Sequence, residues 1–237
     1  MQNPFFGEFM GTLILILMGN GVVAAVLLKQ SKAEGSGWLV IATGWALAVM
    51  AGVLTAIACG SPDAHLNPAV TIAMAVRTGD FSSVGTYVAA QLLGAMTGAA
   101  LVWLTYLPHW AVTKDAAAKL GCFATAPAIR HPLMNCIPEF IGTFVLVLVA
   151  SAIGSKLVSA SFAPPLVGMV VWAIGLSLGG PTGYAINPAR DLGPRIAHAF
   201  LPIAGKGGSD WGYAVVPIVA PLLGGAAAGA FVAWVGM

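Results

Sequence analysis

The sequence predicts an all-α polytopic membrane protein in which six transmembrane helices and two re-entrant half-helices form an inverted 3+3 repeat. The first observation is composition: of 237 residues, 59% are hydrophobic and 8% are charged, whereas soluble domains carry about 25% charged residues. The second is that the few charged residues leave long uncharged runs between them. The third is that short motifs occur twice, in the same order, in the two halves of the chain.

The uncharged runs set the positions of the helices. A charged side chain at the bilayer centre costs about 2.5–3.5 kcal/mol on insertion scales, and a span needs about 20 apolar residues. The run 64–76 has only 13 residues, so it cannot cross the membrane and must be re-entrant, interfacial or buried. The run 140–155 reaches spanning length only if its helix carries Glu139 into the membrane. The predicted spanning helices are residues 4–28, 37–58, 84–106, 133–155, 163–178 and 212–235.

Two motifs return at similar offsets and indicate internal repeats. The pattern Glu-Phe-x-Gly-Thr begins at Glu8 and again at Glu139, and Asn-Pro-Ala begins at Asn67 and again at Asn187, at offsets of 131 and 120. Each half then holds three helices and one short segment, and an odd number of crossings inverts the second half relative to the first. We therefore expect one membrane domain over residues 1–237, with repeats at about 1–110 and 133–237 joined by the loop 107–132.

Each Asn-Pro-Ala triplet is typical of a helix start, because Asn is a preferred N-cap and Pro suits the first helical position. The first short helix then measures about 14 Å, half a membrane. Two such half-helices entering from opposite sides meet at the midplane by N-termini that each carry about half a positive charge. The sequence therefore predicts a narrow polar pore with a positive centre. The two triplets are Asn67, Pro68, Ala69 and Asn187, Pro188, Ala189.

Composition and spacing also exclude several kinds of site. The net charge of +2 gives no electrostatic reason to expect a nucleic-acid partner. Three cysteines without a CxxC pattern, and four histidines without metal-ligand spacing, predict neither a disulfide framework nor a metal site. No His-Glu-x-x-His motif or Ser-His dyad supports an intramembrane enzyme. We therefore expect no metal, no cofactor and no catalytic residues.

The paired motifs carry a resemblance to a known family. The segments His65–Val70 and Asn187–Asp191, together with the two Glu-Phe-x-Gly-Thr patterns, resemble the aquaporin or major intrinsic protein family, and most closely its bacterial glycerol-facilitator (aquaglyceroporin) branch. The resemblance covers essentially the whole chain and includes Phe123–Pro127 and Gly180–Gly183. It implies an aquaporin-like channel in a plasma or inner membrane, surrounded by lipid and assembled as a homotetramer.

The resemblance also implies a selectivity filter. The four positions of the family's narrowest constriction correspond here to Trp45, Gly175, Tyr184 and Arg190. Water-selective members usually carry His at the position of Gly175, so glycine implies a wider passage. Trp45 and Tyr184 would face the carbon backbone of a polyol, and Arg190 would donate to its hydroxyls. Tyr184 departs from the best-known glycerol facilitators, which carry Phe.

The expected mechanism is passive. The amides of Asn67 and Asn187 donate to a solute oxygen at the midplane, and nearby carbonyls accept from its hydroxyls. Asp191 and the two motif glutamates are expected to support the structure by holding backbone groups. The expected pore-lining carbonyls belong to Ala64, His65, Leu66, Gly183, Tyr184 and Ala185.

Two functional classes stay open on the residues alone. The leading one is a passive channel for glycerol and other small neutral solutes, including water, dihydroxyacetone, urea and protonated lactic acid, that excludes ions and protons. The alternative is an ion- or proton-coupled secondary transporter, which also uses broken helices at the midplane. Coupling would need a titratable residue on the path, and Glu8 and Glu139 are the candidates.

Charge distribution and packing motifs supply three more expectations. The family places both termini in the cytoplasm. In that orientation the cytoplasmic loops hold only Arg77 and Lys156 as basic residues, so the positive-inside rule favours the reverse orientation. The GxxxG pairs at Gly7, Gly94 and Gly225 predict close helix packing. Trp residues near predicted helix ends are expected to act as interfacial anchors, and His198 is expected at the surface or in a loop. Those Trp residues are Trp38, Trp110, Trp211 and Trp234.

Overall fold

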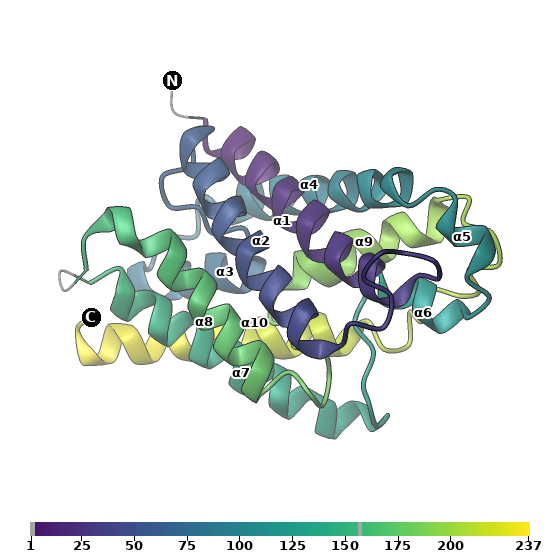
Figure 1. The fold of residues 1–237 in the computed structure, drawn as a ribbon. Coiled ribbons are helices and arrows are strands. Elements are labelled where there is room, and N and C mark those ends of the chain that lie inside the picture. The colour runs from purple at the N-terminus through teal and green to yellow at the C-terminus, as the bar shows by residue number, and fades with distance from the viewer. Residues whose placement is uncertain (1–2, 156–157) are drawn as a thin grey trace.

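The computed structural model describes residues 3–155 and 158–237, and these residues fold as one bundle of helices (Figure 1). Lys156, which entered the count of cytoplasmic charges, lies outside the described residues. The elements in chain order are α1 (Pro4–Leu27), α2 (Trp38–Ala58), α3 (Pro68–Thr78), α4 (Val84–Thr105), α5 (His109–Val112), α6 (Ala116–Gly121), α7 (Pro132–Ile153), η1 (Ala160–Phe162), α8 (Ala163–Ser177), α9 (Pro188–Phe200) and α10 (Val215–Val235).

The long helices match the predicted spans. Within the described ranges, five helices of 21 to 24 residues are long and apolar enough to cross a membrane, namely α1, α2, α4, α7 and α10. The sixth expected span, 163–178, is the apolar helix α8, which has 15 residues and follows the three-residue 3-10 helix η1. At 1.5 Å per residue α8 measures about 22 Å. The half-helices α3 and α9 have 11 and 13 residues and are too short to cross.

Glycines let the helices approach closely, at Gly94 as its GxxxG pair predicted and also at Gly224, which lies outside those pairs. A Cβ added at Gly94 of α4 would lie 2.3 Å from the carbonyl oxygen of Phe9 in α1. One added at Gly224 of α10 would lie 2.4 Å from the carbonyl oxygen of Phe140 in α7. The α1–α4 and α7–α10 contacts therefore have the same construction in the two halves. α2 and α8 also pack against each other, which joins the halves.

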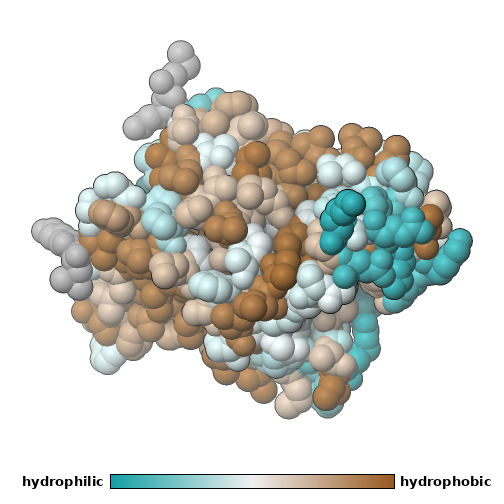
Figure 2. Space-filling model, in the orientation of Figure 1, coloured by the Kyte–Doolittle hydropathy of each residue, from teal (hydrophilic) through white to brown (hydrophobic). Residues whose placement is uncertain are grey.

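The polar surface gathers at one end of the bundle. Figure 1 shows α5 and α6 at that end, opposite the start of α1 and the end of α10. Figure 2 shows hydrophilic residues over it and largely hydrophobic residues over the flanks of the helices. The connection 107–132 was expected to be a loop, but it contains α5 and α6. Loop backbone there thus gains local helical hydrogen bonds.

Two expectations about single side chains were wrong. Trp110 is 2% exposed and donates to the carbonyl oxygen of Trp103 at 2.9 Å, so it is a core residue and not an interfacial anchor. Trp234, by contrast, is 81% exposed. His198 lies fully buried within α9, where its Nδ1 is 2.9 Å from the Ser209 hydroxyl. Ser209 belongs to the connection 201–214, so this connection contacts α9 at His198.

Candidate functional site

The site is built around the N-termini of the half-helices α3 and α9. Asn67 is the N-cap of α3, and its Oδ1 accepts from the backbone N–H of Ala69 at 2.8 Å. Asn187 is the N-cap of α9, and its Oδ1 accepts from the N–H groups of Ala189 and Arg190 at 3.0 and 3.2 Å. Pro68 and Pro188 occupy the first helical positions. Both amide oxygens are therefore occupied by the helices that they cap.

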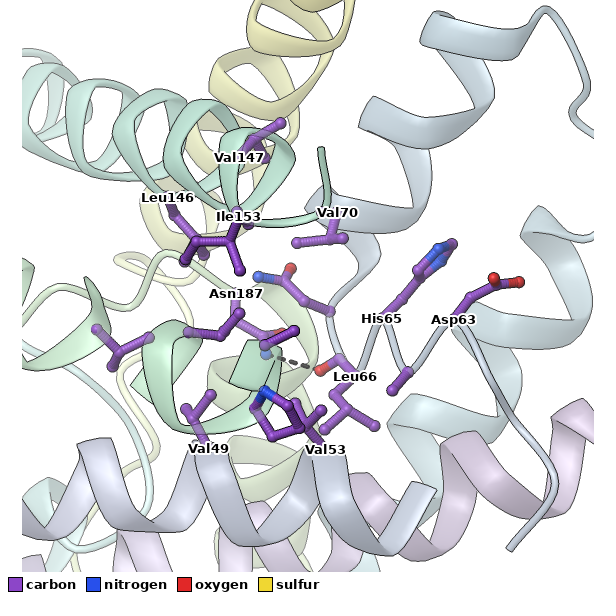
Figure 3. Close-up of a pocket in the computed structure, with 18 of the residues that line it drawn as sticks. Val49, Val53, Asp63, His65, Leu66, Val70, Leu146, Val147, Ile153 and Asn187 are labelled. Carbon is purple, nitrogen blue, oxygen red and sulfur yellow. Dashed lines mark hydrogen bonds between the residues drawn. The ribbon is translucent and has the colours of Figure 1, made fainter. Parts of the chain in front are cut away.

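The amide nitrogens cross between the two motifs. Asn187 Nδ2 donates to the carbonyl oxygen of Leu66 at 2.8 Å (Figure 3), and Asn67 Nδ2 donates to that of Ile186 at 2.8 Å. These reciprocal bonds hold the N-termini of α3 and α9 next to each other. The carbonyl of Ile186 was not among the predicted ones, although the 120-residue offset from Leu66 would have identified it.

The backbone segment that leads into each half-helix, residues 64–66 before α3 and 184–186 before α9, is called its approach. In both approaches every second residue has a left-handed conformation. Positive φ angles occur at Ala64 (43°) and Leu66 (53°), and again at Tyr184 (38°) and Ile186 (41°). Such angles are unfavourable for residues with a Cβ and persist only where the surroundings determine them. Non-helical backbone at membrane depth also needs partners for its polar groups. Both approaches therefore require donors and acceptors from neighbouring helices.

Glu8 of α1 provides these partners for the first approach. Its Oε1 accepts from the Ser61 hydroxyl and the His65 N–H, both at 2.8 Å. Its Oε2 accepts from the Leu66 N–H at 2.7 Å and from Gln91 Nε2 at 2.8 Å. The carboxylate is fully buried, and these four bonds compensate for its loss of water.

Glu139 of α7 does the same for the second approach. Its Oε1 accepts from the Thr182 hydroxyl at 2.7 Å and the Ala185 N–H at 2.9 Å, and its Oε2 accepts from the Ile186 N–H at 2.8 Å. These three donors, one hydroxyl and two backbone N–H groups, repeat the first three donors of Glu8 in type and order. Sequence reasoning missed Ser61, Thr182 and Gln91, since none of these residues belongs to a repeated motif.

A cavity of about 770 Å³ leads to the paired motifs from the end of the bundle where α10 stops. Arg77 lies at its mouth and donates to the carbonyl oxygen of Met237 at 2.5 Å. Figure 3 shows Leu146, Val147 and Ile153 on one side of the cavity and Val49 and Val53 on the opposite side, with the bond from Asn187 to the Leu66 carbonyl oxygen between them. Of the expected pore-lining positions, the lining includes Asn67, Asn187, Ala64, His65, Leu66, Tyr184, Ala185, Trp45 and Arg190.

Trp45, Tyr184 and Arg190 form the inner end of this cavity. The guanidinium carbon of Arg190 lies 4.2 Å from the centroid of the Trp45 ring. The three side chains are 4%, 5% and 8% exposed, so little open space remains between them. Gly175 and Gly183 are not among the residues that line the cavity.

Gly175 instead lies behind Tyr184. A Cβ added at Gly175 would be 2.8 Å from Cζ and 2.9 Å from the hydroxyl oxygen of Tyr184. Trp38 donates from Nε1 to the Gly175 carbonyl oxygen at 2.9 Å, and its ring meets the Tyr184 ring edge-on with centroids 5.6 Å apart. Trp38 is 40% exposed, as an interfacial anchor would be, but it also fixes the tyrosine ring from behind.

Asp191 connects α9 to the polar end of the bundle. Its Oδ2 accepts from the backbone N–H and the hydroxyl of Thr125, both at 2.7 Å. Its Oδ1 lies 2.8 Å from Arg195 Nε in a fully buried ion pair. The Arg195 guanidinium also donates to the carbonyl oxygens of Thr125, Ser209 and Asp210. One ion pair therefore ties both connections, 107–132 and 201–214, to the helix that carries Arg190.

Comparison with known proteins gives the same result by sequence and by structure. The family model described as Major intrinsic protein matches residues 2–232. The glycerol uptake facilitator protein of Bacillus subtilis is 55% identical over 233 residues, covering 97% of this chain and 84% of the relative. Glycerol uptake facilitator protein 3 of Lactiplantibacillus plantarum is 58% identical over 232 residues and covers 95% of each chain.

A solved structure agrees with these sequence relatives. The X-ray structure of the aquaglyceroporin from Plasmodium falciparum superposes with a TM-score of 0.85 at 30% sequence identity. The superposition covers 97% of this chain and 94% of the other. The arrangement of the helices is therefore shared over nearly the whole length of both proteins.

Proposed function

Because the chain belongs to the major intrinsic protein family, we propose that it is a passive transmembrane channel for glycerol and other small neutral solutes. The observation that carries this proposal is the reciprocal pair of bonds between Asn67 and Ile186 and between Asn187 and Leu66, at the inner end of a cavity. Relatives at 55% and 58% identity that are named glycerol uptake facilitators support glycerol as the solute.

The asparagines act as donors in this proposal. Each amide NH2 carries two hydrogens, and one is used in the cross-link to the opposite motif. The second is available for a solute oxygen. Carbonyls of the two approaches accept from solute hydroxyls, so the solute stays hydrogen-bonded as it passes the midplane. The candidate carbonyls are those of Ala64, His65, Leu66, Gly183, Tyr184 and Ala185, with Ile186 now added.

The filter comprises Trp45, Gly175, Tyr184 and Arg190. The aromatic rings contact the carbon side of a polyol, and the guanidinium of Arg190 donates to its hydroxyls. Gly175 contributes indirectly, since the space left by its missing side chain is filled by the Tyr184 ring. Tyr184 is thereby kept away from the passage, and a solute wider than water can enter.

Ions and protons are excluded by a positive centre. The N-termini of α3 and α9 each contribute about half a positive charge where they meet, and Arg190 adds a full one. A cation or hydronium at this point is repelled, whereas a neutral solute is not. Glu8, Glu139 and Asp191 serve as structural supports in this proposal, because their carboxylate oxygens are occupied by protein donors.

Stopped-flow light scattering of proteoliposomes tests the proposal. We expect glycerol efflux that rises linearly with its gradient and is the same with or without a proton or sodium gradient. Flux that saturates steeply or follows an ion gradient would instead identify the coupled transporter. Relative rates for water, dihydroxyacetone, urea and lactic acid at low pH then rank the solutes.

We further propose that the channel is a homotetramer in the lipid bilayer. The support for four subunits is the resemblance to the aquaporin family. The exposed apolar faces of α2 and α8 suit lipid and protein neighbours equally, so they do not by themselves indicate the number of subunits. Leu39 and Met169, for example, are 60% and 58% exposed. Native mass spectrometry of the detergent-solubilised protein is expected to give four times the chain mass of 24.0 kDa.

A further inference from the structure

Gly19 lies against the indole of Trp45. This glycine is buried in the middle of α1, and its position belongs to none of the repeated motifs. A Cβ added there would lie 2.2 Å from Cζ3, 2.3 Å from Cε3 and 2.6 Å from Cη2 of Trp45. These three atoms form one edge of the six-membered ring. The indole therefore occupies the space that any side chain at position 19 would need.

The same indole also borders the site. Trp45 lines the cavity, and the guanidinium carbon of Arg190 lies 4.2 Å from its ring centroid. The tryptophan thus contacts both the backbone of α1 and the arginine. Its distance from the passage depends on how closely it can approach Gly19.

We propose that Gly19 is a specificity-determining residue, which sets the width of the constriction from behind by allowing Trp45 to lie against the backbone of α1. The inference rests on the proposed function, because it requires Trp45 to border the permeation path. A methyl group at position 19 would displace the ring edge away from α1, toward Arg190 and the cavity.

α1 cannot retreat to make room for that methyl group. On the side of α4, a Cβ at Gly94 would be 2.3 Å from the Phe9 carbonyl oxygen, and one at Gly98 would be 2.6 Å from that of Leu13. The backbones of α1 and α4 are therefore already in contact at these glycines. Moving the indole is the remaining adjustment, and it narrows the passage. Since glycerol is wider than water, glycerol permeation decreases more.

The test measures glycerol and water permeability of the same proteoliposomes by stopped-flow light scattering. We expect Gly19→Ala to lower the ratio of glycerol to water permeability about tenfold, the lower bound for one methylene of misfit in a shaped pocket. The ratio does not depend on how many channels reconstitute. Gly21→Ala is the matched control, because a Cβ at Gly21 meets nothing within 4 Å, and its ratio should equal that of the wild type.

A second pair of variants tests whether the effect passes through the indole. Trp45→Phe removes the ring edge that the methyl group would contact, so adding Gly19→Ala in this background should leave the ratio within twofold. If Gly19→Ala alone fails to reconstitute, Trp45→Phe is expected to restore it. An unchanged ratio in Gly19→Ala, an equal loss in both backgrounds, or failure of both variants to reconstitute would overturn the inference. A wild type that passes no glycerol would instead reject the proposed function.

Discussion

Tyr184 differs from its neighbours at the constriction because its buried hydroxyl has no hydrogen-bond partner among the described residues. The ring is fixed by Trp38 and by the space at Gly175. A buried hydroxyl without a partner is unfavourable by about 1–3 kcal/mol, and this hydroxyl lies on the side of the ring that faces Gly175. Substitutions at residues behind the Tyr184 ring are therefore expected to alter which solutes pass.

Replacing Gly175 with a larger residue tests this arrangement. We expect Gly175→His to reduce glycerol permeability far more than water permeability, because its Cβ would already be 2.8 Å from Tyr184 Cζ and the ring must move. Paired glycerol and water permeabilities in proteoliposomes provide the measurement. Gly180→Ala is the control, as its Cβ meets nothing within 4 Å. Equal losses for both solutes would show that Gly175 does not act on the constriction.

Removing the charge of Arg190 tests the positive centre. A unit charge about 5 Å from a permeating cation is worth roughly 3 kcal/mol at an effective dielectric constant of about 20. We therefore expect Arg190→Val to raise proton or cation conductance at least tenfold. A pH-sensitive dye inside proteoliposomes under an imposed potential measures it. Unchanged proton conductance in this variant would remove Arg190 from the barrier.

The two re-entrant approaches are held in similar ways but not equally. Glu8 accepts four hydrogen bonds and Glu139 three, and the difference is Gln91. The Leu-Leu-Gly triplet that follows Gln91 recurs 130 residues later, and the position that corresponds to Gln91 is then Pro221. Proline has no side-chain donor. The second half-helix is instead tied down by the bonds of Asp191 to Thr125 and of Arg195 to the carbonyl oxygens of Thr125, Ser209 and Asp210. Each approach therefore depends on a buried carboxylate supplied by a neighbouring long helix.

Removing one of these carboxylates should destabilise the element that it holds. Glu139→Ala leaves three buried donors without their acceptor, each worth about 1–3 kcal/mol. We expect a clearly lower unfolding temperature of the detergent-solubilised protein. Glu34→Ala is the control, since the ion pair of Glu34 with Lys29 is exposed and worth at most about 1 kcal/mol. Equal unfolding temperatures for both variants would contradict the supporting role of Glu139.

The whole molecule is an integral membrane protein whose basic residues gather at the end that carries α5 and α6. Most of these cations have local partners. Lys206 donates to three carbonyl oxygens at the end of α9, and Lys119 donates to those of Ala204 and Gly205. Arg130 pairs with Asp210. Burial of the Arg130–Asp210 contact is slight, and the hydrogen bond to Asp210 raises the pKa of Arg130. These charged side chains therefore stabilise the fold of the connections at that end.

The orientation in the membrane follows as a prediction at this scale. We expect both termini in the cytoplasm, so that the end carrying α5 and α6 faces outward. In a chain without its native cysteines, Ser36→Cys should react with a membrane-impermeant maleimide on intact cells. Ser83→Cys, equally exposed at the opposite end, should react only after permeabilisation. The reverse pattern would follow the positive-inside rule and contradict the family placement.

Local sequence properties were sufficient to predict where the long helices and the half-helices lie. The length of an uncharged run decides whether a segment can cross the membrane, and Asn followed by Pro favours the start of a helix. The repeat offsets also indicated which residues correspond in the two halves. α5 and α6 were missed because short helices in a polar connection have little hydrophobic periodicity.

The folded chain was needed to show which groups meet. Gln91 and Glu8, Trp38 and Gly175, and Gly19 and Trp45 are far apart in the sequence and carry no shared motif. Their contacts depend on how closely the helices pack, which varies with every side chain between them. Sequence patterns thus located the elements and named most of the candidate site, whereas the distances between helices decided how closely Trp45, Tyr184 and Arg190 approach one another and what holds them.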